Sequence, residues 1–88
     1  MKRFEGKRVL VTGASRGLGR DMALRFAAEG AAVFVGYRHR SEEAAECATR
    51  CAELGVEATP IELDLEDSAA IRTAVSALPA LDVLVNNA

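Results

Sequence analysis

A glycine-rich stretch near the N-terminus has the residue types and spacing of a phosphate-binding turn. Three glycines lie close together in the sequence Thr12-Gly13-Ala14-Ser15-Arg16-Gly17-Leu18-Gly19. Gly13 permits a sharp exit from a strand, Gly17 lets the backbone approach a phosphate, and Gly19 removes a side chain where a helix meets a sheet. Because unpaired N–H groups at a helix N-terminus attract anions, we predict that a pyrophosphate binds here.

A second group of residues bears on which dinucleotide such a turn would accept. An NAD site has an acidic side chain at the end of the second strand. This sequence instead has four consecutive residues without a carboxylate, namely Tyr37, Arg38, His39 and Arg40. Arg38 can meet the 2′-phosphate of NADP with its planar guanidinium, and Arg16 can approach it from the glycine turn. We therefore predict a preference for NADP, with a merely solvated basic loop as the alternative.

The elements that must position these groups follow from the apolar pattern. Four short apolar runs, each a predicted strand, occupy residues 8–12, 32–37, 56–63 and 81–85. Three stretches with the period of a helix lie between them, at residues 17–29, 41–54 and from 67 or 68 to 78. Pro60 cannot donate to a ladder, so the strand at 56–63 is expected at a sheet edge. Alternating strands and helices predict a Rossmann-type α/β fold, a doubly wound parallel sheet with helices on both faces.

The first predicted helix carries two apolar rows side by side. We call them the large row and the small row, and they consist respectively of Leu18, Met22 and Phe26, and of Gly19, Ala23 and Ala27. This combination is typical of a helix lying close against a sheet. In the last predicted strand, Leu81, Val83 and Val85 point to one face and Leu84 to the other. Both faces of that strand therefore require cover, which does not suit an edge.

The two cysteines, Cys47 and Cys51, fall one turn apart on the apolar stripe of the second predicted helix, for which Ser41 is the expected cap. A disulfide between them would close almost no loop. A structural zinc site needs about four ligands, and the only histidine is His39. We expect buried thiols that act as small apolar side chains and no metal site, with a two-thiolate metal site as the alternative.

Composition limits the classes of function. The chain has 88 residues, of which 50% are hydrophobic and 27% charged, so it has room for one small domain but not for two. The formal net charge is -2, and we expect no nucleic-acid partner. No apolar run approaches the roughly 20 residues of a membrane-spanning helix, and the first residues lack the apolar stretch of a signal peptide. We expect no membrane association and a cytoplasmic location.

The glycine turn combines with two further motifs, Asp64-Leu65 after the third predicted strand and Asn86-Asn87-Ala88 after the fourth. Together they resemble the short-chain dehydrogenases/reductases over all 88 residues, and among these most closely the 3-oxoacyl-(acyl carrier protein) reductases. The resemblance implies that the pyrophosphate and the adenosine ribose are surrounded by Gly13, Ser15, Arg16, Gly17, Leu18 and Gly19. It also implies that Asp64 and Leu65 border the adenine, that Asn86 and Ala88 line the ribose, and that Asn87 ties the fourth strand to its neighbours.

The same resemblance implies which parts of such an enzyme lie elsewhere. In the family, Ala88 is followed by a glycine, a further helix, and later a serine with a Tyr-x-x-x-Lys pair that acts on the substrate carbonyl. Tyr37, the only tyrosine here, has no lysine four residues later. We therefore expect no catalytic residue in this chain. Residues 1–88 are expected to be the N-terminal dinucleotide-binding part of a single Rossmann domain, with an incomplete sheet of strand order 3-2-1-4.

These features favour the NADP(H)-binding part of an oxidoreductase. The enzyme would transfer hydride between the nicotinamide and a carbonyl or alcohol substrate, with a carrier-bound acyl chain as one candidate, and the intact protein would be a homo-oligomer. Two alternatives remain: a nucleotide-binding module without turnover, and a truncated, inactive fragment.

Overall fold

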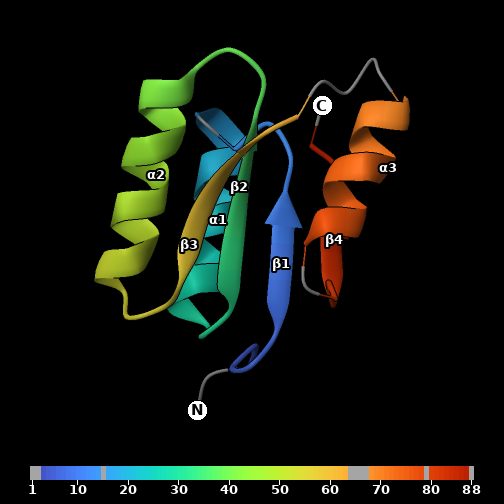
Figure 1. The fold of residues 1–88 in the computed structure, drawn as a ribbon. Coiled ribbons are helices and arrows are strands. Elements are labelled where there is room, and N and C mark those ends of the chain that lie inside the picture. The colour runs from blue at the N-terminus through green and yellow to red at the C-terminus, as the bar shows by residue number, and fades with distance from the viewer. Residues whose placement is uncertain (1–2, 15, 64–67, 79, 88) are drawn as a thin grey trace.

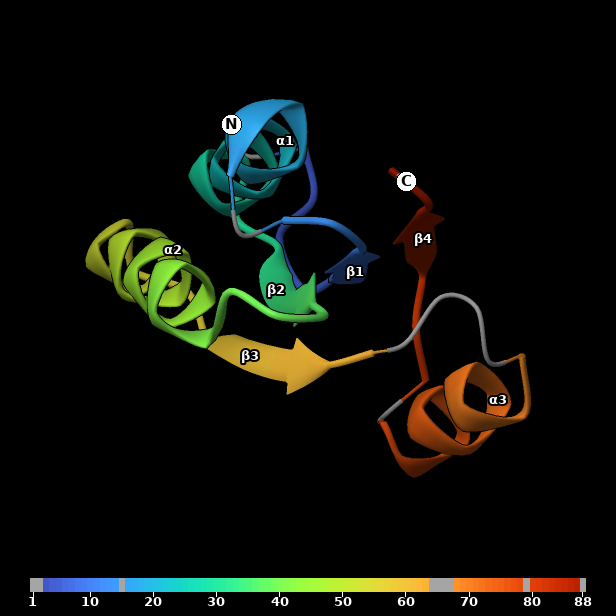
Figure 2. The ribbon, with the colours of Figure 1, turned by 90° about the horizontal axis from the view of Figure 1, so that it is seen from above.

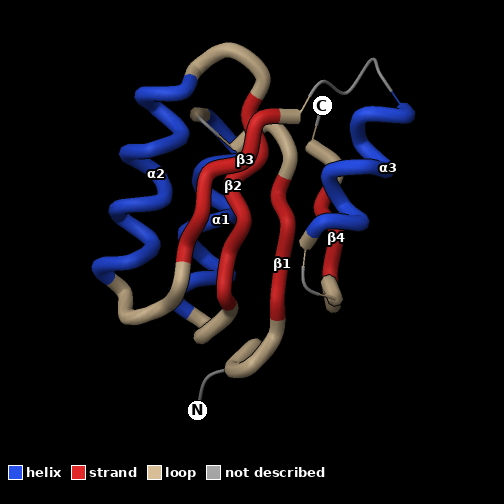
Figure 3. The backbone as a smooth tube through the Cα atoms, viewed as in Figure 1, coloured by secondary structure: helices blue, strands red, loops and turns tan. Residues whose placement is uncertain are grey.

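A computed structural model describes residues 3–14, 16–63, 68–78 and 80–87. Its strands are parallel and form one sheet in the order β3-β2-β1-β4 (Figure 1, Figure 3). Their bounds, each within the predicted range, are β1 (Arg8–Val11), β2 (Ala32–Tyr37), β3 (Ala58–Glu62) and β4 (Val83–Val85). The predicted strand order is confirmed.

The helices occupy both sides of this sheet. They are α1 (Gly17–Ala28), α2 (Ser41–Glu53) and α3 (Ser68–Ala77). Figure 2 shows α1 and α2 on one side and α3 on the other, toward the end of the sheet where β4 lies. The predicted doubly wound arrangement is therefore confirmed. No helix in the described ranges combines the length and the hydropathy that are needed to span a membrane.

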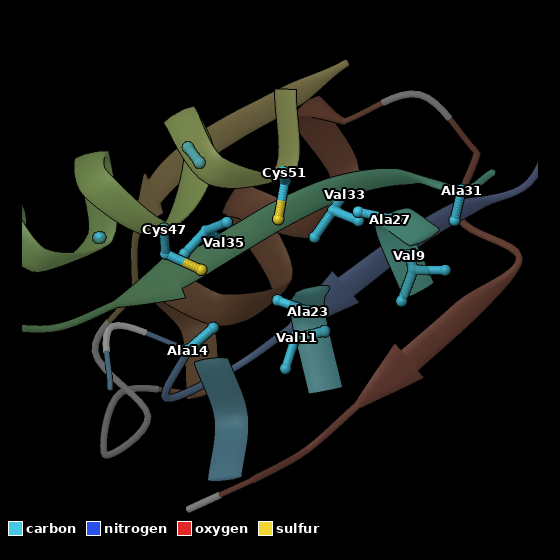
Figure 4. Packing of buried hydrophobic residues seen from close by; sticks show 12 residues of the cluster. Val9, Val11, Ala14, Ala23, Ala27, Ala31, Val33, Val35, Cys47 and Cys51 are labelled. Atoms are coloured by element: carbon cyan, nitrogen blue, oxygen red, sulfur yellow. The ribbon is translucent and has the colours of Figure 1, made fainter. Parts of the chain in front are cut away.

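The core lies between the two central strands and the pair α1 and α2. Val9 pairs with Val33 and Val11 with Val35 across the β1–β2 ladder, and all four side chains are at most 1% exposed (Figure 4). Leu10 points to the opposite face and is also buried. Each buried valine contributes about 1.5–3 kcal/mol relative to an exposed one. Branched side chains on both faces thus place β1, and the turn that follows it, in the centre of the sheet.

Helix α1 meets the sheet through its small row, whose three residues are all buried. The large row is less buried than the small row: Leu18 is 66% exposed, whereas Met22 and Phe26 are half-buried. Phe26 contacts Phe4 edge to face, with ring centroids 5.1 Å apart. Two hollows of about 450 and 500 Å³ border this large row. The predicted close approach of α1 to the sheet is thus confirmed. The small residues form the contact, because all three are buried.

The predicted cap of α2 by Ser41 is wrong. Ser41 is the first helical residue, and the N-cap is Arg40, whose side chain makes no capping hydrogen bond. Instead, the Arg40 guanidinium lies 3.0 Å from a carboxylate oxygen of Glu43. Acidic side chains are favourable at this end of the helix dipole, and Glu42 and Glu43 occupy the first turn.

The edge position of β3 follows from its proline. The Val33 amide donates to the carbonyl of Glu57 at 2.9 Å, and the Leu63 amide donates to the carbonyl of Tyr37 at 2.7 Å. In a parallel ladder alternate residues donate to the same neighbour, so position 60 faces away from β2. Pro60 therefore removes a donor only on the free side of the strand, and the predicted edge is confirmed.

Strand β4 forms the other edge among the described residues. Val83 and Val85 are half-buried, whereas Leu84 is 55% exposed. The start of the strand is fixed to β1, because the Arg8 amide donates to a carboxylate oxygen of Asp82 at 2.8 Å and the Asp82 amide donates to the Arg8 carbonyl at 2.9 Å. This edge carries no proline.

Candidate nucleotide site

Gly13 and Gly19 are packed so closely that neither position has room for a side chain. A Cβ atom at Gly13 would overlap the carbonyl oxygen of Asn87. A Cβ atom at Gly19 would overlap the carbonyl oxygen of Gly13 and lie 2.7 Å from Nδ2 of Asn87. These two glycines therefore bring the start of α1 and the end of β4 against the turn.

Gly17 has a different role, because it borders open space. Its φ of 63° lies in the left-handed region, and, apart from its chain neighbours and the backbone of α1, no atom of the described residues lies within 4 Å of the position that a Cβ would take. Gly17 is the first residue of α1, and the N-cap Arg16 makes no side-chain capping bond. The first-turn amides of a helix have no partners within the helix. An uncapped helix start beside open backbone is the arrangement that receives a phosphate.

Thr12 joins this turn to the end of β4. Its side chain is 4% exposed, its amide donates to the Val85 carbonyl at 2.9 Å, and its hydroxyl oxygen accepts from the Asn87 amide at 2.9 Å. The hydroxyl itself has two acceptors within 3.2 Å, the Val85 carbonyl and Oδ1 of Asn86. Nδ2 of Asn87 donates to the Gly13 carbonyl at 3.4 Å. The predicted tie between Asn87 and its neighbouring strand is present in this network.

The end of β2 is attached to the same turn. The Ala14 amide donates to the Gly36 carbonyl at 3.0 Å, so the glycine turn lies beside the residues that follow Gly36. Of these, Tyr37 is half-buried, while Arg38 and His39 are exposed, as is Arg16 on the turn. The carboxyl ends of the parallel strands β1, β2 and β4 thus lie together at the same end of the sheet. Open α/β sheets bind their ligands beyond the carboxyl ends of their strands.

The structure brings together most of the predicted cofactor residues. The predicted residues of the glycine turn, of the end of β2 and of the end of β4 all lie at the carboxyl end of the sheet. They are Gly13, Arg16, Gly17, Leu18, Gly19, Tyr37, Arg38, His39 and Asn86. A hollow of about 290 Å³ lies at the start of α2, lined by His39, Arg40, Ser41, Glu42 and Glu43. The remaining predicted residues, Ser15, Asp64, Leu65 and Ala88, lie outside the described residues, so their roles stay predictions.

Comparison with known proteins decides the family. The family model for short chain dehydrogenases matches residues 7–88. The chain belongs to the short-chain dehydrogenase family. A 3-oxoacyl-[acyl-carrier-protein] reductase of Staphylococcus aureus is 43% identical over 86 residues, which cover 93% of this chain and 35% of that protein. An L-rhamnose 1-dehydrogenase (NAD(P)(+)) of a Sphingomonas species is 39% identical over 92 residues, covering 100% of this chain and 36% of that protein.

Solved short-chain dehydrogenase structures share the fold. The reductase LugOII superimposes with a TM-score of 0.91 at 37% identity, covering 100% of this chain and 40% of that one. The landomycin C-6 ketoreductase LanV, solved with bound NADP and rabelomycin, gives a TM-score of 0.88 at 35% identity, covering 97% and 39%. This short-chain dehydrogenase chain spans about a third of the length of the curated relatives, at 35% and 36%.

One residue of the site was missed by sequence reasoning. The sequence pattern ends a strand at Thr12 and indicates no further role for it, yet Thr12 links the glycine turn to Asn86 and Asn87. The available signal was its polarity, because a hydroxyl at the end of an otherwise apolar run is buried and must find a partner. Its partner lies 75 positions away, which no local pattern reveals.

Proposed function

We propose that this chain is the NADP(H)-binding part of a short-chain reductase or dehydrogenase that acts on a carbonyl or alcohol. The observation that carries the proposal is the open backbone at Gly17, at an uncapped helix start, with Arg16 and Arg38 nearby and no carboxylate at the end of β2. Relatives support a nicotinamide cofactor, since LanV was solved with NADP and the Sphingomonas enzyme is named for NAD(P)(+).

Each part of the cofactor has residues suited to it. The first-turn amides of α1 would hold the pyrophosphate against Gly17, while Gly13 and Gly19 keep the turn compact. Asn86, at the end of β4, would line the adenosine ribose. Asp64, Leu65 and Ala88 are proposed for the adenine and ribose, and Ser15 for the phosphates. The bound nicotinamide supplies the hydride, and this chain's residues hold and orient it.

The preference for NADP rests on charge. A 2′-phosphate adds negative charge and acceptor oxygens, and two guanidinium groups can offer charge-assisted hydrogen bonds that NAD cannot use. Arg16 lies on the glycine turn and Arg38 directly follows β2, and these two residues are the proposed phosphate contacts. An acidic residue at the end of β2, which would repel the phosphate, is replaced by Tyr37.

The substrate is proposed at the level of class. The named relatives include reductases and a sugar dehydrogenase, which supports a carbonyl or alcohol and, more specifically, a carrier-bound 3-oxoacyl chain. The catalytic serine, tyrosine and lysine are proposed to lie outside these 88 residues, and the intact enzyme is proposed to be a cytoplasmic homo-oligomer. A nucleotide-binding module without turnover is the second candidate.

The cofactor proposal is tested on the intact enzyme to which this chain is proposed to belong, by titrating it with NADPH and with NADH and measuring the fluorescence of the bound nicotinamide. We expect NADPH to bind at least ~10-fold more tightly, which corresponds to about 1.4 kcal/mol. Arg38→Asp should remove most of this discrimination, whereas Arg25→Asp, on the exposed side of α1, should leave it unchanged. Equal affinities for the two cofactors, or an unaltered preference in Arg38→Asp, would show the proposal to be wrong.

A further inference from the structure

The hydroxyl group of Thr12 contacts two consecutive residues after β4, and the two contacts differ in kind. Its oxygen accepts a hydrogen bond from the backbone amide of Asn87 at 2.9 Å, and it lies 3.2 Å from Oδ1 of Asn86. The first contact fixes the backbone that follows β4. The second contact reaches a side chain that we propose for the adenosine ribose, and it therefore bears on how that side chain is held.

The surroundings of the hydroxyl assign its single proton. Two acceptors lie within 3.2 Å, the carbonyl of Val85 and Oδ1 of Asn86. The Val85 carbonyl already accepts from the Thr12 amide at 2.9 Å. Donation to Oδ1 instead gives the Asn86 carboxamide a partner on the side of the buried threonine. We therefore assign the proton to this contact, while the hydroxyl oxygen accepts from the Asn87 amide with a lone pair.

This assignment gives the Asn86 carboxamide a direction. Thr12 is 4% exposed, whereas Asn86 is an exposed residue. A carboxamide has an acceptor oxygen on one side and an NH2 donor on the other. Because the buried hydroxyl holds the oxygen, the NH2 group is left for a ligand at the carboxyl end of the sheet. A side chain that is held in this way also loses less conformational freedom when a ligand binds.

We propose that Thr12 is a positioning residue for the nucleotide, whose hydroxyl holds the Asn86 carboxamide so that its NH2 group donates to an oxygen of the adenosine ribose. This role rests on the proposed function and adds to it the atom that meets the ribose and the residue that orients that atom. Thr12 is buried, so it acts through Asn86 and not by contact with the cofactor.

The chemistry of the hydroxyl predicts how substitutions at position 12 rank. Valine has nearly the shape of threonine but can neither donate nor accept a hydrogen bond, so it removes both contacts. Serine keeps the hydroxyl but lacks the branched Cβ that restricts χ1 in threonine. We therefore expect nucleotide affinity to fall slightly from threonine to serine and strongly from serine to valine.

The test is a double-mutant cycle in the intact enzyme to which this chain is proposed to belong. We expect Thr12→Val to weaken NADPH binding ~10-fold when Asn86 is present and less than ~2-fold in the Asn86→Ala background. The lost contact with the Asn87 amide is common to both backgrounds, so it cancels in this comparison. Thr12→Ser should restore most of the affinity. Thr59→Val, which replaces an exposed threonine of β3, should leave the affinity unchanged.

Urea unfolding of the same variants without nucleotide tests the hydrogen bond itself. We expect Thr12→Val to lose less stability in the Asn86→Ala background than when Asn86 is present. Equal losses of stability in the two backgrounds would overturn the hydrogen bond, and an equal weakening of NADPH binding in both would overturn the positioning role. Failure of the proposed function is distinguishable, because the unsubstituted enzyme would then bind no NADPH. The positioning role would be wrong in that case as well, whereas the unfolding cycle would still measure the contact.

Discussion

Replacing Gly17 with alanine is expected to damage the site while sparing the fold. The φ of 63° makes any L-residue there strained by about 1–2 kcal/mol, but the surrounding space is open, so no further cost arises in the free chain. Gly13→Ala has a similar strain at φ 61° and also overlaps the Asn87 carbonyl oxygen, which adds roughly 1–3 kcal/mol. The methyl group at Gly17 would occupy the space that we assign to a phosphate.

Urea unfolding followed by circular dichroism, together with NADPH titration, separates the two effects. The control is Gly6→Ala, because Gly6 has a φ of 81° and open space but precedes β1, at the far end of the sheet from the site. We expect Gly17→Ala and Gly6→Ala to lose similar stability, and only Gly17→Ala to bind NADPH at least ~10-fold more weakly. The reasoning is refuted if Gly17→Ala destabilises the chain as much as Gly13→Ala, or if it binds NADPH like Gly6→Ala.

Three further predictions concern the fold around the site. Thr12→Val leaves the Asn87 amide without its acceptor and should cost about 1–3 kcal/mol in urea unfolding, whereas Thr12→Ser should cost less; equal losses would contradict the role given to the hydroxyl. Ala23→Leu should cost about 1–3 kcal/mol by forcing α1 away from the sheet, and Ala28→Leu, on the exposed side, should be nearly neutral. Residues 1–88 alone should show no NADPH oxidation with carbonyl substrates and should self-associate in light scattering through the β4 edge. Leu84→Lys should reduce that association, and a soluble monomer with turnover would disprove the prediction.

The sequence predicted the elements well because their signals are local. Runs of branched apolar residues such as Val9 to Val11 define buried strands, and Pro60 alone assigns β3 to an edge. It did not predict that Leu18 would be exposed, since a hydrophobic row indicates a face without saying what covers it. The predicted Ser41 cap is wrong because α2 begins one residue earlier than that cap requires, with Arg40 as the N-cap, and helix boundaries are poorly defined by sequence.

The site could be predicted only in part. The glycine spacing located the turn, and the structure shows close packing at Gly13 and open space at Gly17, both with positive φ. The phosphate contact at Gly17 stays a prediction. The attachment of the turn to Thr12 and Asn87 depends on strand order, which motif spacing alone does not encode. Which basic residue contacts a phosphate depends on the positions of the side chains relative to the bound cofactor, and that contact stays a prediction.

The bond between Thr12 and the Asn87 amide also sets an order of events during synthesis. The two residues are 75 positions apart. At the usual 5–20 residues per second, the glycine turn is made roughly 4–15 s before the residue that completes its support. Until then, Thr12 lacks its partner and the turn lacks the contact that holds Gly13 in place. A nucleotide would therefore select chains in which β4 has already joined β1, and its binding would report that the sheet has been assembled.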